Sequence, residues 1–209
     1  MSLDRHIAEF REIVDAIYGT YLDACEGFTR VRARAAEMEE ESVRTYEDAK
    51  SKHPDISHLP FGGAEFSYGR WVPAGSQPRY RHLHQVPIEA LRRRNEDGGS
   101  NFQFIGNVCV VTLFQYWEHY FRLQFAHDLG VEKNDLDVPL FGELRRYRQA
   151  IIHNRGIATA EVEECALLRA SRRGEPLLFH RNLFEEIIDG ILGFLHGLQE
   201  RPEQFIRRA

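Results

Sequence analysis

The 209-residue sequence predicts an all-α protein, an up-down helical bundle with a long N-terminal helix and an irregular insertion rich in proline and glycine. Three observations support this prediction. Apolar residues recur at intervals of three and four along most of the chain, which is the period of an amphipathic helix. No proline occurs before Pro54. Five of the eight prolines then fall within residues 53–99, where they interrupt the helical pattern.

The composition is that of an ordinary globular protein, without the charge of a general nucleic-acid binder. The net charge is −5, so any contact with nucleic acid requires a local basic patch. The three cysteines are widely spaced and odd in number, which argues against a disulfide framework or zinc cluster and for a reducing compartment. No run approaches 18 apolar residues, and the N-terminus has no apolar signal core. We therefore expect a cytoplasmic protein without a membrane span.

The pattern divides the chain into four segments. Residues 1–52 form a long helix, or a helical hairpin, that packs on the bundle. Residues 53–99 form the irregular insertion, residues 100–200 the helical core, and residues 201–209 an exposed tail. The first segment has an apolar stripe made by Leu3, Ile7, Phe10, Val14, Ile17 and Tyr21. As one rod it would be about 70 Å long, so it bends, protrudes or packs on a partner chain.

The insertion combines weak secondary structure with an unusual mixture of side chains. Residues 64–68 alternate as a short strand does, and residues 87–94 predict a short helix with proline at its first position. Aromatic and basic residues are interleaved at Tyr68, Arg70, Trp71, Arg79, Tyr80 and Arg81. Such a mixture can stack bases and neutralise phosphates. The alternative is a loop that its aromatic rings hold to the surface. The spacing of His82 and His84 suits a metal, but no third ligand is evident.

The core segment predicts three main helices and one short one. The first runs over about 101–128 and is apolar on nearly all sides, which is typical of a helix in the middle of a bundle. Gly130 ends it as a left-handed residue. The others cover about 138–154, 159–170 and 183–199, the last capped by Asn182. Three glycines on one face of the last helix, Gly190, Gly193 and Gly197, predict the close approach of another helix.

Arg148 and His153, near the end of helix 138–154, form the candidate site. A guanidinium is a rigid fork for phosphate oxygens, and an imidazole can transfer a proton near neutral pH. On a continuous helix the two side chains lie about 140° apart. Within a single chain, the two side chains therefore meet only if the helix unwinds towards Gly156 or if the Arg148 side chain extends around the helix. Otherwise a second chain completes the site.

The run Arg148-Gln-Ala-Ile-Ile-His153, followed by Asn154-Arg155-Gly156, resembles the Arg-x4–6-His motif of HEPN domains. The resemblance covers roughly residues 100–200. HEPN domains are all-α modules common in toxin–antitoxin and phage-defence systems, and many are metal-independent ribonucleases whose dimers bring two motifs together. The sequence departs from the family pattern at Gln149, where asparagine, aspartate or histidine is usual.

The resemblance implies a metal-independent endoribonuclease without a cofactor, which cleaves RNA by attack of the 2′-hydroxyl on the adjacent phosphorus. The catalytic residues would be Arg148, His153 and Asn154, with Glu118, Arg122, Gln149 and Arg145 in support. Glu118 and Arg122 suit a helical ion pair, and in the functional interpretation Glu118 also orients Arg148. RNA would bind to Arg155, Arg92, Arg93 and Arg94. The expected partners are RNA, a second copy of the chain and an antitoxin.

Two alternatives to the ribonuclease remain open. The same motif occurs in modules without catalytic activity, which bind RNA, a nucleotide or a partner such as a nucleotidyltransferase antitoxin. The chain can also be a dimerising helical scaffold, in which Arg148 and His153 are interface or capping residues. A basic cleft around the motif would favour the enzyme, and a motif that faces protein would favour the scaffold.

Overall fold

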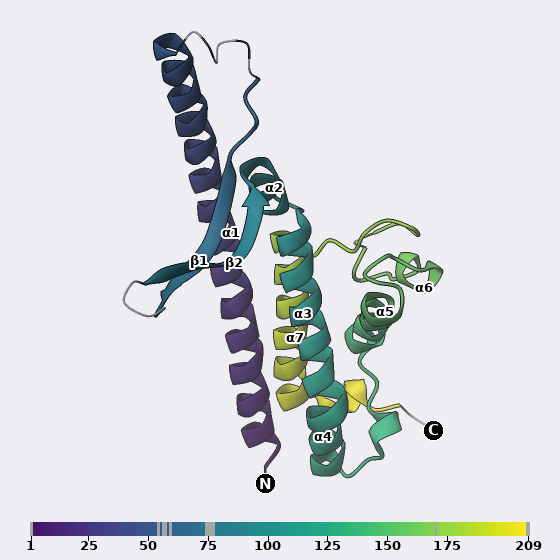
Figure 1. The fold of residues 1–209 in the computed structure, drawn as a ribbon. Helices are drawn as coiled ribbons and strands as arrows, with labels where there is room; N and C mark the ends of the chain where they lie inside the picture. The colour runs from purple at the N-terminus through teal and green to yellow at the C-terminus, as the bar shows by residue number, and fades with distance from the viewer. Residues whose placement is uncertain are drawn as a thin grey trace. The chain divides into compact units, whose positions relative to one another are not determined.

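The computed structural model describes residues 2–53, 55, 58, 60–73, 78–169 and 171–207. These residues are mostly helical and contain a single two-stranded sheet, which confirms the mainly α-helical class (Figure 1). The chain divides into two units. Met1–Cys25 and Phe102–Ala209 form what we call the bundle unit, and Glu26–Asn101 form the hairpin unit. Among the described helices, none is long and apolar enough to cross a membrane.

Helix α1 (Leu3–Lys52) is continuous and contributes to both units, so residues 1–52 are one helix and not a helical hairpin. In the bundle unit, Ile7, Phe10 and Tyr21 of its predicted stripe are at most 1% exposed. In the hairpin unit the stripe continues with Ala35, which is fully buried. The apolar residues that recur every three or four positions therefore form the side of α1 that faces the core in each unit.

The bundle unit contains the helices that follow the insertion. They are α3 (Ser100–Tyr116), π-helix η2 (Trp117–Phe121), α4 (Arg122–Leu129), 3-10 helix η3 (Lys133–Asp135), α5 (Pro139–His153), α6 (Ala160–Glu163), α7 (Arg181–Glu200) and 3-10 helix η4 (Pro202–Phe205). Figure 1 shows α5 nearly along its axis, so α5 crosses the direction of α3 and α7. The core contains a cluster of aromatic side chains, in which the rings of Trp117 and Phe141 stack with centroids 4.0 Å apart.

The predicted helix over residues 101–128 is interrupted by the π-helical turn at Trp117–Phe121. Trp117 and Phe121 are both buried, at 2% and 1% exposure, and the Phe121 ring stacks on Phe10 with centroids 4.5 Å apart. A wider turn changes which side chains share a face. The regular α-helical period therefore does not correctly predict which side chains after Tyr116 face the core. Gly130, with φ of 69°, ends α4 in the left-handed conformation that the sequence predicted.

Two local predictions after α5 were wrong. Helix α6 ends at Glu163, whereas the pattern predicted a helix over 159–170. The Glu143 carboxylate accepts hydrogen bonds of 2.7–3.1 Å from the backbone amides of Ala166, Leu167 and Leu168, so these amides bind a side chain in place of helical carbonyls. Helix α7 is capped by His180, whose Nδ1 accepts from the Leu183 amide at 3.3 Å, and Asn182 lies inside the helix.

The C-terminal segment packs on the bundle instead of forming an exposed tail. The Phe205 ring meets Phe194 edge to face at 5.0 Å, and the Phe205 carbonyl accepts from the Asp137 amide at 2.8 Å. A Cβ at Gly197 would lie 3.0 Å from the Phe205 ring, and one at Gly190 would lie 2.9 Å from a Leu140 methyl. The glycines of α7 thus make room for two side chains.

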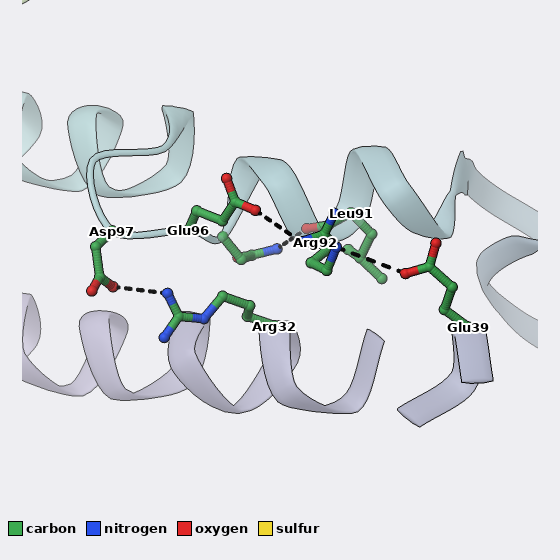
Figure 2. Close-up of polar contacts among 7 residues, drawn as sticks. Arg32, Glu39, Leu91, Arg92, Glu96 and Asp97 are labelled. Carbon is green, nitrogen blue, oxygen red and sulfur yellow. Dashed lines mark hydrogen bonds and ion pairs between the residues drawn. The ribbon is translucent and has the colours of Figure 1, made fainter. Parts of the chain in front are cut away.

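The hairpin unit contains a β-hairpin where the sequence predicted an irregular insertion with one short strand, and it contains the short helix that the sequence predicted over residues 87–94. Strands β1 (Glu65–Val72) and β2 (Arg79–Pro87) pair antiparallel, and α2 (Ile88–Arg94) follows directly. Val86, Ile88 and Leu91 form a small core with Ala35 of α1. Ion pairs join α1 to α2 and the turn after it, Arg32 to Asp97 at 3.2 Å and Arg92 to Glu39 at 3.7 Å (Figure 2).

Candidate functional site

Helix α5 presents Arg148 and His153 on different sides. It remains helical through His153, so the two side chains diverge by about 140° and unwinding before His153 does not bring them together. Leu144 and Tyr147 are fully buried and fix the core-facing side of α5. The Tyr147 hydroxyl donates to the Leu168 carbonyl, which further fixes the rotation of the helix. Arg148 and His153 therefore do not form one site within a single chain.

Arg148 is half-buried and carries an unused hydrogen-bond donor. Its Nε is shielded from solvent and has no hydrogen-bond partner among the described residues. A buried N–H group without a partner costs about 1–3 kcal/mol of stability. An anionic oxygen that reached this guanidinium would satisfy the group, and phosphate matches its forked geometry.

His153 is exposed at the last residue of α5 and leads into a tight turn. The amides of Asn154 and Gly156 both donate to the Ala150 carbonyl, at 3.0 and 3.1 Å, and Gly156 has a φ of 73°. The Asn154 side-chain nitrogen donates to the Ile157 carbonyl at 2.8 Å. Asn154 thus holds the turn through its amide nitrogen, and the imidazole of His153 projects from the end of the helix.

Glu118 does not orient Arg148 in this structure. Its carboxylate binds Lys133 Nζ at 2.6 Å and Arg122 Nη1 at 3.2 Å, and Arg122 also donates to the Leu136 carbonyl. The predicted ion pair with Arg122 is present, but Lys133 was missed because it follows 15 residues later, outside any helical spacing. Burial raises the pKa of the Glu118 carboxyl, but the hydrogen bonds and charges of Lys133 and Arg122 outweigh it and lower the pKa.

The remaining supporting residues lie on the open face of α5. Arg145 and Gln149 are exposed and four residues apart, so they share one side of the helix. His153 follows Gln149 by another four residues, and Ile152 on the same side is 46% exposed. The face that carries His153 is therefore accessible to a ligand or to a second copy of the chain.

The four predicted RNA-binding arginines lie in both units. Arg155 is exposed in the turn after α5, with a φ of 55°. Arg92, Arg93 and Arg94 belong to α2 of the hairpin unit. Arg92 pairs with Glu96 as well as Glu39 (Figure 2), and Arg94 Nη1 lies 3.0 Å from the ring Nε2 of His84. Arg92 and Arg94 therefore have partners inside their own unit, and Arg93 is the exposed member of the triplet.

The part of the chain that the structure describes shows no metal site, and two of the three cysteines are poor candidates for nucleophilic chemistry. It contains no group of three or more His, Cys, Asp or Glu side chains that could hold a metal ion. Burial raises the pKa of Cys109 to about 11, and it also raises the pKa of Cys165. These two thiols stay protonated at neutral pH, so they are poor nucleophiles.

The structure contains one buried polar pair that sequence patterns do not indicate. His6 of α1 and Asp128 of α4 are joined through His6 Nδ1 and Asp128 Oδ2, with side chains 1% and 5% exposed. The second ring nitrogen of His6 has no partner among the described residues, and the Tyr120 ring meets the imidazole edge-on at 6.5 Å. The pair is enclosed within the bundle unit, away from solvent.

A scan against protein-family models finds no match for this chain, and searches of curated proteins and of solved structures find none either. The function must therefore be inferred from the side chains themselves and from the positions that the helices give them.

Proposed function

We propose that the chain is a metal-independent endoribonuclease of the HEPN type, acting in a toxin–antitoxin or defence system. The observation that carries the proposal is the pair of unused groups on α5. Arg148 has a shielded Nε that finds no hydrogen-bond partner among the residues the structure describes, and His153 is exposed five residues later at the end of the same helix. RNA cleavage without a metal uses a cation that stabilises the phosphorane and groups that transfer protons, and Arg148 and an exposed imidazole suit these roles.

In the proposed mechanism His153 transfers a proton and Arg148 stabilises negative charge. A base removes the proton of a 2′-hydroxyl, and the oxygen attacks the adjacent phosphorus. The new 2′-oxygen–phosphorus bond forms as the bond to the 5′-oxygen breaks, and that oxygen takes a proton from an acid. The products are a 2′,3′-cyclic phosphate and a 5′-hydroxyl. His153 acts as the base or the acid, and Arg148 binds the anionic phosphorane. DNA has no 2′-hydroxyl and is not cleaved.

Two copies of the chain complete the site in this proposal. Because Arg148 and His153 of one α5 point about 140° apart, the proposal places two α5 helices around a two-fold axis so that Arg148 of one copy faces His153 of the other. The open surface around Ile152 supports this arrangement, since a side chain 46% exposed on a polar face gains by being covered. Each active centre would then combine groups from both copies.

We assign the enzyme to the cytoplasm. Cys109 and Cys165 are free thiols, a state that a reducing compartment maintains. A ribonuclease in that compartment acts on the RNA of its own cell, so the proposal includes an antitoxin that restrains it. An antitoxin that covered the exposed α5 face would block His153 directly.

A non-catalytic module that binds RNA or a partner is the second candidate. The observation that favours it is the hydrogen bond from the Asn154 side-chain nitrogen to the Ile157 carbonyl at 2.8 Å. Asn154 is the third proposed catalytic residue, and this bond uses its side-chain nitrogen to hold the turn after α5. A module of this kind would use Arg148 to hold a phosphate and would leave the RNA intact.

The test is incubation of the purified protein with single-stranded and structured RNA in excess EDTA. We expect cleavage in EDTA that is lost in His153→Ala and in Arg148→Ala. The matched control is His127→Ala, which removes another histidine with an exposed side chain, 83% accessible on α4, and should cleave normally. Mass spectrometry should find cyclic phosphate ends. RNA that is bound but never cut would favour the binding module, and cleavage that survives His153→Ala would remove His153 from the chemistry.

A further inference from the structure

The β-hairpin of the hairpin unit has two faces with different side chains. Trp71 lies opposite Tyr80, and Arg70 lies opposite Arg81. A bulge lies between Tyr68 and Gly69, because Tyr68 pairs with His84 while Gly69 pairs with His82. Directly opposed residues of an antiparallel pair project from the same face of the sheet. The aromatic pair and the arginine pair therefore occupy opposite faces of one ribbon.

The aromatic face is a fixed row of rings. The ring centroids of Trp71 and Tyr80 are 5.3 Å apart and those of Tyr80 and His82 are 5.0 Å apart, both in edge-to-face contact. His82 is held in turn by Ser67, whose hydroxyl lies 2.6 Å from the ring Nδ1. A Cβ at Gly69 would lie 2.6 Å from the Tyr80 ring, so the absent side chain lets that ring lie across β1. The row ends at Trp71, which is 68% exposed.

The opposite face concentrates positive charge that is not neutralised. Arg70, Arg79 and Arg81 are exposed, and none forms an ion pair with any residue that the structure describes. From Glu65 to Pro87 the sequence has these three arginines and one acidic residue, in a chain with a net charge of −5. Like charges directly opposite one another destabilise a strand pair. An anionic ligand would remove this repulsion between Arg70 and Arg81.

We propose that this hairpin binds single-stranded nucleic acid. An unpaired base stacks on the free face of Trp71, and the strand crosses the edge of the ribbon, so that neighbouring phosphates contact Arg70, Arg79 and Arg81 on the other face. Aromatic rings and unneutralised arginines on one narrow ribbon match a ligand that alternates flat bases with phosphates. A duplex does not fit as well, because its bases are already stacked on each other. The proposal does not depend on RNA cleavage and applies equally to a protein that only binds.

The two tryptophans give a direct optical test with the full-length protein. Trp71 is 68% exposed and Trp117 is 2% exposed, so quenching by acrylamide reports mainly on Trp71. An oligouridine or oligothymidine of about 12 nucleotides is within the range that such surfaces accommodate. We expect either oligonucleotide to quench this emission, to protect the residual emission from acrylamide, and to bind with similar affinity.

Variants separate stacking from charge in a companion anisotropy titration with labelled oligonucleotide. Trp71→Ala should weaken binding roughly five- to 150-fold, the range found for one stacked base, and Trp71→Phe should restore part of the loss. Three phosphate contacts predict a log–log salt slope of about −2 for wild type. Replacement of Arg70, Arg79 and Arg81 by glutamine should bring the slope close to zero.

The matched control changes the same charge at three exposed positions on α1. Glutamine at Arg30, Arg34 and Arg44 should leave affinity and salt slope as in wild type, and far-UV circular dichroism should show that every variant is folded. The proposal is overturned if wild type binds neither oligonucleotide, if the hairpin variants bind as wild type does, or if duplex binds as tightly as single strand. It is also overturned if only vesicles containing phosphatidylserine bind, since the hairpin would then recognise a membrane surface.

Discussion

The Nδ1 atom of His6 lies 2.6 Å from Asp128 Oδ2, and the two side chains are only 1% and 5% exposed. The residues are 122 positions apart, so this contact joins the first turn of α1 to the last turn of α4. A buried carboxylate is tolerated only where a donor satisfies it, and His6 is that donor. The pair therefore locates the N-terminal end of the chain on the bundle.

Loss of either member of this pair should destabilise the protein strongly. His6→Ala leaves a buried carboxylate without its donor, and Asp128→Ala leaves a buried imidazole without its acceptor. Each should lower the free energy of unfolding by about 3 kcal/mol, measured by urea titration at neutral pH. The double variant should cost less than the sum of the single variants, because the two residues share one interaction.

The control for this pair is His127→Ala. His127 contacts the same aspartate at 3.5 Å, but its side chain is 83% exposed, so its loss should change stability by no more than about 0.5 kcal/mol. If the effects of His6→Ala and Asp128→Ala were simply additive, the two residues would contribute independently and the pair would not be the source of stability.

Glu118 should make stability depend on acid pH. Lys133 and Arg122 lower the pKa of this carboxyl in the folded protein despite its burial. A lowered folded pKa means that the stabilisation is complete above the ordinary glutamate pKa of about 4.3 and is lost as pH falls through the folded value. Wild type should therefore exceed Glu118→Gln in urea midpoint at pH 7, and the difference should shrink towards about pH 3. A difference that is constant with pH would contradict the ionic contribution.

The Glu143 carboxylate should hold the segment that follows α6. It accepts from three consecutive backbone amides, Ala166 to Leu168. Hydrogen bonds to a charged group contribute about 1.5–3 kcal/mol, so Glu143→Gln should raise amide exchange at these positions about ten- to a hundredfold. Hydrogen-exchange mass spectrometry can measure this. Glu163→Gln, at an exposed neighbouring site, should leave exchange unchanged, and equal rates in both variants would show that Glu143 does not hold the segment.

Two glycines in the bundle unit should respond oppositely to alanine. A Cβ at Gly106 of α3 would lie 2.7 Å from the Phe179 Cβ, so Gly106→Ala should cost about 1–3 kcal/mol of unfolding free energy. A Cβ at Gly142 of α5 would meet no atom of the described residues within 4 Å, and Gly142→Ala should stabilise the helix by about 0.5–1 kcal/mol. Thermal melts of the two variants should shift in opposite directions. If both variants raised the melting temperature, the residues around Gly106 would accommodate the new methyl group without loss of stability.

Local patterns predict the helices well because the information lies within a few residues. The predicted helices 138–154 and 183–199 correspond to α5, Pro139–His153, and α7, Arg181–Glu200. Gly130 was identified as the end of α4 because left-handed backbone favours glycine. The hairpin was only partly predicted. The alternation at residues 64–68 is short, and β2 is exposed except at Tyr80 and Val86, so it lacks an apolar period.

Contacts between distant residues could not be predicted in this way. Nothing near Glu143 in the sequence shows that it captures the amides of residues 166–168, and nothing near Glu118 identifies Lys133 as its partner. For the candidate site, the motif identified Arg148 and His153 and the helical period gave the angle between them. The shielding of the Arg148 Nε is a property of the packed structure, and helical spacing alone does not predict it.

The division of α1 between two units has a consequence for the order in which the chain folds as it leaves the ribosome. The hairpin unit is one uninterrupted stretch of sequence, whereas the bundle unit needs both the first residues of the chain and the last. Domains tend to fold as their sequence emerges, N-terminal parts first. Glu26–Asn101 can therefore fold before the residues after Phe102 have been synthesised. Ile7, Phe10 and Val14 pack against those later residues, so they stay exposed until then. During that interval the start of α1 exposes an apolar surface that a chaperone would recognise.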